Sequence, residues 1–270
     1  MSANLKGGDV IVGGTKMSYV SFGHGDKTLV FLPGLSDGLV TVRGKAILLY
    51  RPYRLFFDKF TVYIFSRKDD MPDGYSISDM AADQAAALRA LGIEKACIAG
   101  ISQGGMISQH LAAGFPELVE KLVLAVTAPY ANETVRNAVS GWIKMAEDGD
   151  HKRLMLDTAE KTYSDRYLEK NKMLLPLHGM IGKPKSYRRF LINANAILDY
   201  DARDILGRIT CPTLIIGGGR DKTVGTEAAY ELHDGIAGSE LYIYPEIGHG
   251  VWEHDEAPDF NKRIFDFLEK

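Results

Sequence analysis

The sequence predicts an α/β protein with a mostly parallel central sheet of about eight strands, flanked by helices and carrying an inserted helical segment. Short runs of β-branched and aliphatic residues recur along the chain and alternate with helix-like segments. These runs are apolar at successive positions, as is typical of strands that are covered on both faces. The alternation stops after Thr127 and resumes near residue 205, which indicates the insertion.

The strand predictions follow from these apolar runs. The parallel strands are expected at Leu29–Leu32, Thr61–Phe65, Ala96–Ile101, Lys121–Val126, Thr213–Ile216 and Leu241–Tyr244. The stretch from Asp9 to Ser21 instead indicates two strands that turn at Gly13 and Gly14. Such a turn is typical of an antiparallel hairpin, which we place at one edge of the sheet.

Three helices of the main domain are predicted from apolar residues at helical spacing and from their stop signals. They are Ser78–Leu91, Gly104–Ala113 and Asp259–Leu268. Gly92 ends the first, while Gly114 and Pro116 end the second.

The insertion lies between the predicted strands Lys121–Val126 and Thr213–Ile216. It has amphipathic helical stretches and no convincing strand. We therefore expect a core domain of residues 1–128 and 205–270 and a helical insertion of residues 129–204 over one end of the sheet. Its helices are expected at Glu133–Glu147, Lys152–Thr162 and Lys185–Leu198.

Composition and charge indicate which kinds of molecule this protein binds. The chain has 270 residues, a formal net charge of -3 and a pI of about 6.2, so it lacks the basic surface of a nucleic-acid-binding protein. No apolar run is long enough for a signal peptide or a membrane span. We expect a cytoplasmic protein that acts on a small molecule, with no membrane partner. A homodimer stays an open alternative.

Neither a metal nor an organic cofactor is expected. The seven histidines include no HExxH pattern and no Cys/His cluster with zinc spacing. Gly217–Gly219 resembles a phosphate loop only in its glycines, since no Gly-Lys-Ser/Thr follows it.

The strongest chemical signal is the pentapeptide from Gly100 to Gly104, with Ser102 at its centre. It follows a strand-like run and opens a helix-like one, which is the context of a nucleophile elbow. A tight turn between strand and helix strains the backbone at the serine, and bulk two residues away on either side would clash. This pattern predicts that Ser102 is a nucleophile, held by Gly100 and Gly104.

A serine hydroxyl needs a base, and His249 is the candidate. It lies between two glycines, in the loop between the last strand and the last helix. The nearest rival is His254, whose setting between Glu253 and Asp255 indicates a solvated helix start. Asp221, which follows the strand Thr213–Ile216, is the candidate carboxylate to orient the imidazole.

An oxyanion needs two preorganised hydrogen-bond donors. Gln103 offers its backbone N–H at a helix N-terminus, directly after the serine. The turn after Leu29–Leu32 is expected to supply the second donor, and the Leu35 backbone N–H is our choice.

Together these residues resemble the α/β-hydrolase superfamily, and the resemblance covers nearly the whole chain. Two segments depart from the family pattern. Pro33-Gly34 stands where a His-Gly is common, and Ser66–Asp70 replaces the usual Asp-x-Arg-Gly. The first departure bears on the identity of the second oxyanion donor. The resemblance implies a serine esterase-like or lactonase-like enzyme, with the insertion as a lid.

The insertion is rich in large apolar residues, some of which we expect above Ser102. They are Trp142, Met145, Met155, Tyr163, Tyr167, Met173, Leu174, Leu175, Leu177, Met180 and Phe190. A substrate with an apolar acyl or alcohol group is therefore expected.

The leading functional hypothesis is hydrolysis of a small carboxylic ester through an acyl-enzyme. The same residues also suit a lactone, a carbon–carbon bond of a vinylogous diketone, or peroxide as acyl acceptor, as in a cofactor-free perhydrolase or haloperoxidase. A ligand-binding receptor on the same fold is the non-enzymatic alternative. Fold alone does not decide among these functions.

Overall fold

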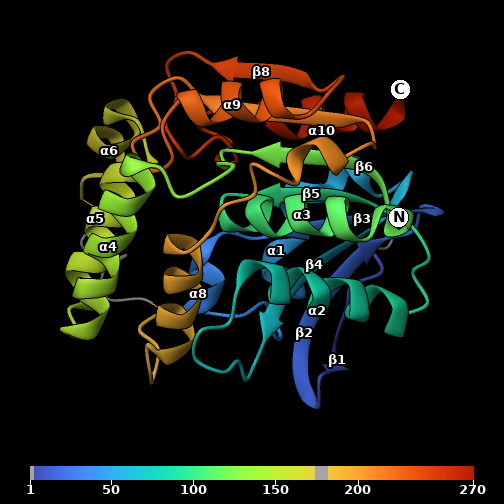
Figure 1. Cartoon of the computed structure of the whole chain (residues 1–270), viewed down its shortest axis with the longest axis horizontal. Coiled ribbons are helices and arrows are strands. Elements are labelled where there is room, and N and C mark those ends of the chain that lie inside the picture. The colour runs from blue at the N-terminus through green and yellow to red at the C-terminus, as the bar shows by residue number, and fades with distance from the viewer. Residues whose placement is uncertain (1–2, 174–181) are drawn as a thin grey trace.

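The computed structural model describes residues 3–173 and 182–270, and in this part of the chain eight strands form one sheet in the order β1-β2-β4-β3-β5-β6-β7-β8 (Figure 1). The strands are β1 Lys6–Val12, β2 Thr15–Gly23, β3 Lys27–Leu32, β4 Phe60–Lys68, β5 Ala96–Ile101, β6 Val119–Ala125, β7 Thr213–Gly218 and β8 Glu240–Tyr244. β2 pairs antiparallel with β1 and β4, and the other pairs are parallel. The predicted fold class is confirmed.

Both faces of this sheet are buried, which explains the runs of consecutive apolar residues. In β3, the side chains of Val30 and Leu32 join the hydrophobic core on one face. The side chains of Leu29 and Phe31 join the core on the other face. Since successive side chains of a strand point to opposite faces, a strand covered on both sides must be apolar throughout.

Helices cover the two faces (Figure 1). α2 Ile77–Ala90, α3 Gln103–Gly114 and α9 Glu227–Gly235 pack on the face of the first core. α10 Phe260–Glu269 packs on the opposite face, next to the 3-10 helix η2 Arg51–Phe56 and the short helix α1 Ala46–Leu49. The bounds of α2, α3 and α10 lie within one residue of those predicted.

The described α-helices between β6 and β7 are α4 Glu133–Glu147, α5 His151–Thr162, α6 Asp165–Asn171 and α8 Arg188–Leu198, and the 3-10 helix η4 Leu206–Arg208 follows them. Figure 1 shows α4, α5 and α6 beyond the ends of the strands. Backbone carbonyls of two of these helices accept hydrogen bonds from the rest of the chain. Gly250 N–H donates to the carbonyl of Thr162 at 2.7 Å, and Gln103 Nε2 donates to the carbonyl of Asn193 at 2.8 Å.

Sequence analysis did not predict α1, η2, α6 or α9, and it did not place the 3-10 helix η1 Leu35–Gly38 after β3. α1 and η2 lack the long apolar periodicity of a packed helix, because only Phe56 among their residues is buried. Within residues 3–173 and 182–270, we find no helix long and apolar enough to cross a membrane.

Candidate active site

Ser102 lies at the strained turn between β5 and α3. Its backbone has φ 55° and ψ -121°, a conformation that costs a non-glycine residue free energy. Gly100 and Gly104, two residues before and after it, have no room for a side chain. A Cβ at Gly100 would lie 2.3 Å from Ser108 Oγ, and one at Gly104 would lie 1.9 Å from the carbonyl oxygen of Leu32. Close backbone packing therefore holds the serine at the tip of this turn.

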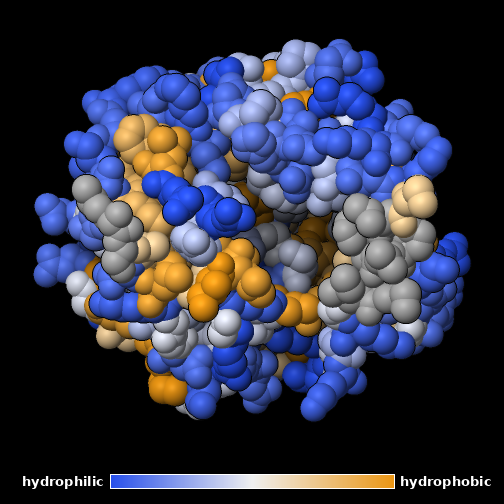
Figure 2. Space-filling view, turned by 180° about the vertical axis from the view of Figure 1, so that it is seen from behind, coloured by the Kyte–Doolittle hydropathy of each residue, from blue (hydrophilic) through white to orange (hydrophobic). Residues whose placement is uncertain are grey.

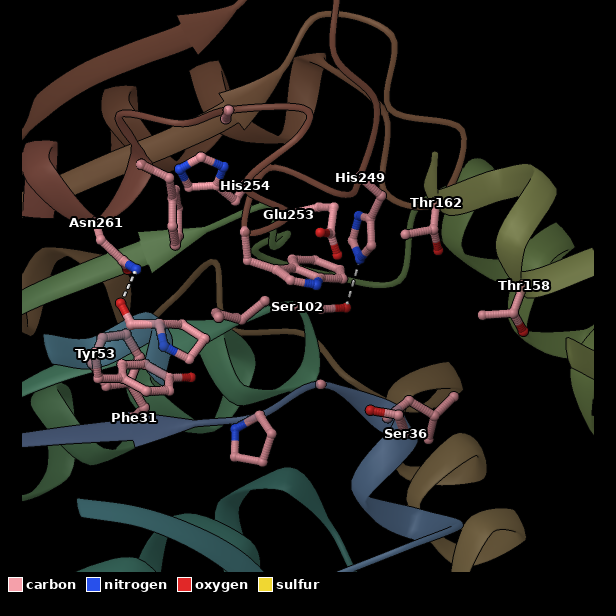
Figure 3. Close-up of a pocket in the computed structure, with 18 of the residues that line it drawn as sticks. Phe31, Ser36, Tyr53, Ser102, Thr158, Thr162, His249, Glu253, His254 and Asn261 are labelled. Carbon is pink, nitrogen blue, oxygen red and sulfur yellow. Dashed lines mark hydrogen bonds between the residues drawn. The ribbon is translucent and has the colours of Figure 1, made fainter. Parts of the chain in front are cut away.

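The structure brings together the three side chains that the sequence pointed to. His249 Nδ1 lies 2.7 Å from Asp221 Oδ2, and His249 Nε2 lies 3.0 Å from Ser102 Oγ (Figure 3). With Nδ1 bound to the carboxylate, Nε2 is left to face the serine hydroxyl. The arrangement is that of a nucleophile, a base and a carboxylate that orients the base.

The carboxylate and the imidazole are both shielded from solvent. Asp221 Oδ1 accepts hydrogen bonds from the backbone N–H groups of Thr223 at 2.7 Å and Val224 at 2.9 Å. The His249 ring packs edge-on against Trp252, with ring centroids 5.7 Å apart. Both members of the pair are more than nine-tenths buried, at 7% exposed for Asp221 and 4% for His249. Their mutual orientation is therefore fixed by packing and hydrogen bonds.

The turn after β3 passes close to the serine. A Cβ at Gly34 would lie 3.3 Å from Ser102 Cβ and 3.7 Å from its Oγ. Leu35 is the first residue of η1, and Gln103 is the first residue of α3. The first backbone N–H groups of a helix have no partner inside the helix. The start of η1 and the start of α3 therefore both leave backbone donors unpaired within their helices.

A buried ionic network connects this turn with the elbow and the insertion. Asp37 Oδ2 lies 2.7 Å from Arg189 of α8 and 3.8 Å from the guanidinium of Arg67. Arg67 in turn donates to Gln103 Oε1 at 3.1 Å. Burial lowers the pKa of Arg67 to about 10, so it is still cationic at neutral pH. The network fixes η1, β4, α3 and α8 relative to one another.

Ser102 opens on a cavity of about 970 Å³. Its lining is mainly apolar and aromatic, and it also includes polar side chains such as Thr158, Thr162 and Asn261. The lining residues are Phe31, Pro33, Gly34, Leu35, Ser36, Arg51, Pro52, Tyr53, Ile101, Ser102, Trp142, Thr158, Thr162, His249, Trp252, Glu253, His254, Ala257, Pro258, Phe260 and Asn261. Figure 3 shows these side chains around Ser102 and His249, including Tyr53 and Asn261 at the end away from α5.

Two titratable groups of this lining are shifted by burial. Burial raises the pKa of the Glu253 carboxyl, and the neighbouring charges of Asp255 and Glu256 raise it further. Burial also raises the pKa of the Tyr53 hydroxyl to about 12. Both shifts favour the uncharged forms, which suits a cavity that holds an apolar group.

The insertion contributes fewer of the expected residues than the sequence suggested. Of its large apolar residues, Trp142 lines the cavity, together with Thr158 and Thr162, which sequence analysis did not name. Trp142 is held by its Nε1, which donates to Asp157 at 2.8 Å. The other expected residues among those described do not line it. Leu174, Leu175, Leu177 and Met180 lie outside the described residues.

The predicted helix start around His254 was wrong. α10 begins at Phe260, and His254 and Asp255 lie in a turn before it. His254 is exposed, as expected, but it also lines the cavity. Asp255 points to the insertion, where it pairs with Lys170 at 2.6 Å.

Comparison with known proteins agrees with this fold. The sequence model of the alpha/beta hydrolase fold family matches residues 27–255. A 2-hydroxy-6-oxononadienedioate/2-hydroxy-6-oxononatrienedioate hydrolase of Klebsiella pneumoniae is 31% identical over 191 residues, which cover 66% of this chain and 64% of that relative. A hydrolase of the same name from Dechloromonas aromatica is 27% identical, covering 98% of this chain and 93% of that relative.

Among solved structures, the enol-lactonase of Burkholderia xenovorans superposes with a TM-score of 0.84 at 21% identity, covering 97% of this chain and 100% of the other. At that identity the likeness concerns the fold. The chain belongs to the alpha/beta hydrolase fold family. The relatives it matches are named as hydrolases, and the matched stretch spans less than two thirds of the Klebsiella relative.

Replacing Gly104 by alanine tests the packing that holds the serine. The new Cβ would overlap the Leu32 carbonyl, so the free energy of unfolding should fall by about 1–3 kcal/mol or more, as for other overpacked sites. At Gly114, the end of the same helix, a Cβ would have no atom of the described residues within 4 Å, so Gly114→Ala is the matched control. Urea unfolding of both variants gives the comparison. Equal midpoints would contradict the packing argument.

Replacing Asp37 by asparagine tests the ionic network. It leaves the buried Arg67 guanidinium and the partly buried Arg189 guanidinium without their counter-charge, and the free energy of unfolding should fall by about 3–5 kcal/mol. Asp58 has a side chain that is 81% exposed and pairs with His24, so Asp58→Asn should change stability by less than about 0.5 kcal/mol. A neutral effect of Asp37→Asn in denaturant titrations would show that the network contributes nothing to the fold.

Proposed function

We propose that this protein is a serine hydrolase that cleaves a carboxylic ester through an acyl-enzyme on Ser102. The observation that carries the proposal is the unbroken hydrogen-bonded series from Asp221 through His249 to Ser102, at 2.7 and 3.0 Å, which ends at a cavity. This series has the donors and acceptors that acyl transfer requires.

In the first half of the reaction, Ser102 Oγ attacks the ester carbonyl carbon while His249 Nε2 takes the hydroxyl proton. Asp221 balances the positive charge of the imidazolium. The carbonyl oxygen becomes negative and is met by the backbone N–H groups of Leu35 and Gln103. The imidazolium then gives its proton to the leaving alkoxide, and the acyl group stays on Ser102.

In the second half, water replaces the alcohol. His249 Nε2 takes a proton from this water as its oxygen attacks the acyl carbon. The second oxyanion forms at the same place as the first, so the same two N–H groups stabilise it. Collapse of this intermediate returns the proton to Ser102 Oγ and releases the carboxylic acid.

The cavity lining supports an apolar substrate group. Phe31, Tyr53, Ile101 and Phe260 form a largely aromatic wall on one side of Ser102, on the face that α10 covers. Ligand pockets of this kind gain affinity mainly from apolar burial and orient the ligand with few polar groups. We therefore infer an ester whose acyl or alcohol part is bulky and apolar.

The insertion of residues 129–204 is proposed to act as a lid that sets substrate choice. Trp142, Thr158 and Thr162 bring α4 and α5 to the cavity wall. The hydrogen bond from Gly250 N–H to the Thr162 carbonyl ties the end of α5 to the loop that carries His249. The proposed lid is thus in direct contact with the residue that follows the proposed base.

Cleavage of a carbon–carbon bond beside a ketone is the second candidate, because the relatives are named for hydrolysis of a 2-hydroxy-6-oxo diacid. That substrate name contains no ester, so water must break a bond at the oxo carbon. Ser102 Oγ would attack the oxo carbon and give its proton to His249 Nε2. When the carbon–carbon bond breaks, the leaving carbon would take that proton, and water would then release the acyl group from Ser102. A panel of p-nitrophenyl esters, a lactone and a vinylogous diketone acid separates these reactions by kcat/KM.

The role of Ser102 is tested by Ser102→Ala. Labelling by a fluorophosphonate probe should disappear, and kcat should fall by about four to six orders of magnitude, since only binding and the oxyanion donors remain. Circular dichroism should show an intact fold. Full activity in a folded Ser102→Ala protein would refute the mechanism.

The acid is tested by Asp221→Asn, with Asp255→Asn as the matched control. An amide cannot hold the imidazole in the required tautomer, so kcat should fall by several orders of magnitude. Asp255 is exposed and pairs with Lys170, and its variant should stay within a few-fold of the wild type. The acid is misassigned if Asp221→Asn is nearly silent while another carboxylate variant is inactive.

The lid is tested by Trp142→Ala, with Met145→Ala on the same helix as control. Trp142 is part of the cavity wall, whereas Met145 packs against the core outside it. The Trp142 variant should shift preference toward longer acyl chains, with each methylene worth roughly 1–3 kcal/mol at most. The kcat/KM values for p-nitrophenyl esters of increasing acyl length measure this preference in both variants. An unchanged length profile in Trp142→Ala, at reduced stability only, would rule out the lid assignment.

A further inference from the structure

The segment 43–55, which we call the mouth segment, differs in charge from the rest of the protein. It contains Arg43, Lys45, Arg51 and Arg54 and no acidic residue, although the whole chain has a formal net charge of -3. It comprises α1 and most of η2, on the face of the sheet that α10 also covers. A local excess of positive charge on an acidic protein indicates an anionic partner.

The same segment exposes large aliphatic side chains. Ile47 is 73% exposed, Leu48 is 76% exposed and Leu55 is 47% exposed. None of the four residues of α1 is buried. Single exposed leucines are ordinary, but three in one short segment on a folded surface need an explanation.

Two of the cations are free to meet a partner. Arg51 and Arg54 are exposed, and neither makes an ion pair with any residue in 3–173 or 182–270. Arg54 stacks on the Tyr50 ring, with its guanidinium 5.6 Å from the ring centroid. Arg43, in contrast, is already paired with Asp69 at 2.7 Å. The unpaired charge is therefore at the η2 end of the segment.

The mouth segment is continuous with the candidate active site. Arg51, Pro52 and Tyr53 belong to η2, and all three line the cavity that contains Ser102. Figure 2, which views the molecule from behind Figure 1, shows a hollow in this face with apolar residues gathered beside it. A surface bound to this segment would thus lie at the entrance to an apolar cavity.

We propose that the mouth segment docks on an anionic lipid surface, with Ile47 and Leu48 entering the interface and Arg51 and Arg54 facing lipid headgroups. Exposed aliphatic side chains flanked by unpaired cations are the combination that binds such a surface. Building on the proposed ester hydrolysis, the apolar group of a membrane-borne ester would pass from the lipid directly into the cavity.

Charge favours a lipid surface over a second copy of this chain. A two-fold dimer through the mouth segment would place the same cations opposite one another, and like charges across an interface are unfavourable. The sequence-based expectation of no membrane partner depended on the lack of an apolar run long enough to span a bilayer. A surface of short apolar and basic stretches does not produce such a run.

Vesicle sedimentation tests the docking, and the Ser102→Ala protein is used so that the result does not depend on hydrolysis. Vesicles of phosphatidylcholine alone are compared with vesicles of phosphatidylcholine and phosphatidylglycerol at 3:1. We expect binding to the anionic vesicles and weak or no binding to the neutral ones. No binding to either, or equal binding to both, would overturn the proposal.

Matched variants locate the surface. Ile47→Ser combined with Leu48→Ser should weaken binding by about tenfold or more, because two aliphatic side chains no longer enter the interface. Arg54→Gln should weaken it about fivefold, the equivalent of about 1 kcal/mol for one basic residue at an anionic surface. Tyr230→Ser on α9 and Arg89→Gln on α2 remove an exposed apolar group and a cation from the opposite face, and should change nothing.

Three results would be decisive against the docking proposal. Unchanged binding of the Ile47 and Leu48 double variant would exclude the mouth segment. Equal losses in the α9 and α2 controls would show a non-specific effect. A concentration-dependent dimer in analytical ultracentrifugation that the double variant abolishes would assign the patch to a second copy of the chain. Wild-type hydrolysis of a water-soluble short ester, measured in parallel, reports separately on the proposed function.

Discussion

The close approach of α3 to the end of β3 is the constraint on which the candidate active site depends. At Gly104 the helix passes so near the Leu32 carbonyl that no side chain fits between them. This contact forces the chain from β5 into α3 through one strained residue, Ser102, with φ 55°. The strain is offset by packing around it, and the result is a hydroxyl that projects from the turn. The turn after β3 also passes the serine closely, since a Cβ at Gly34 would lie 3.3 Å from Ser102 Cβ.

A second constraint fixes the insertion to that turn. Asp37 lies between two guanidinium groups, the buried one of Arg67 from β4 and the partly buried one of Arg189 from α8. Buried ion pairs contribute little net stability, but they are costly to break and they define one arrangement. Gln103 extends the network, because its side chain bonds Arg67 on one side and the Asn193 carbonyl on the other. A change in α8 would therefore be transmitted to Gln103, the residue that follows Ser102.

Much of the fold could be predicted from local sequence, whereas the walls of the cavity could not. Leu29–Leu32 is apolar at every position because both faces of the sheet are covered. A run of consecutive apolar residues is visible in the sequence, so this strand could be predicted. The elbow is likewise a local pattern. His249 and Asp221 were found from their places after strands, although the serine and the histidine are 147 residues apart. Thr158 and Thr162 had no such signal, because small polar residues on a helix reach the cavity only through the packing of α5. Arg67 was missed because the partners of its side chain, Asp37 and Gln103, come from two elements distant in sequence.

The covalent intermediate is the most direct test of the central claim that Ser102 carries the acyl group. The protein would be mixed with a p-nitrophenyl ester, quenched in acid within the first turnovers, digested and examined by mass spectrometry. The account predicts an acyl adduct on the peptide that contains Ser102, whose amount grows with the burst of p-nitrophenol. An adduct on a different residue, or hydrolysis at full rate with no adduct under conditions where deacylation is slow, would contradict it.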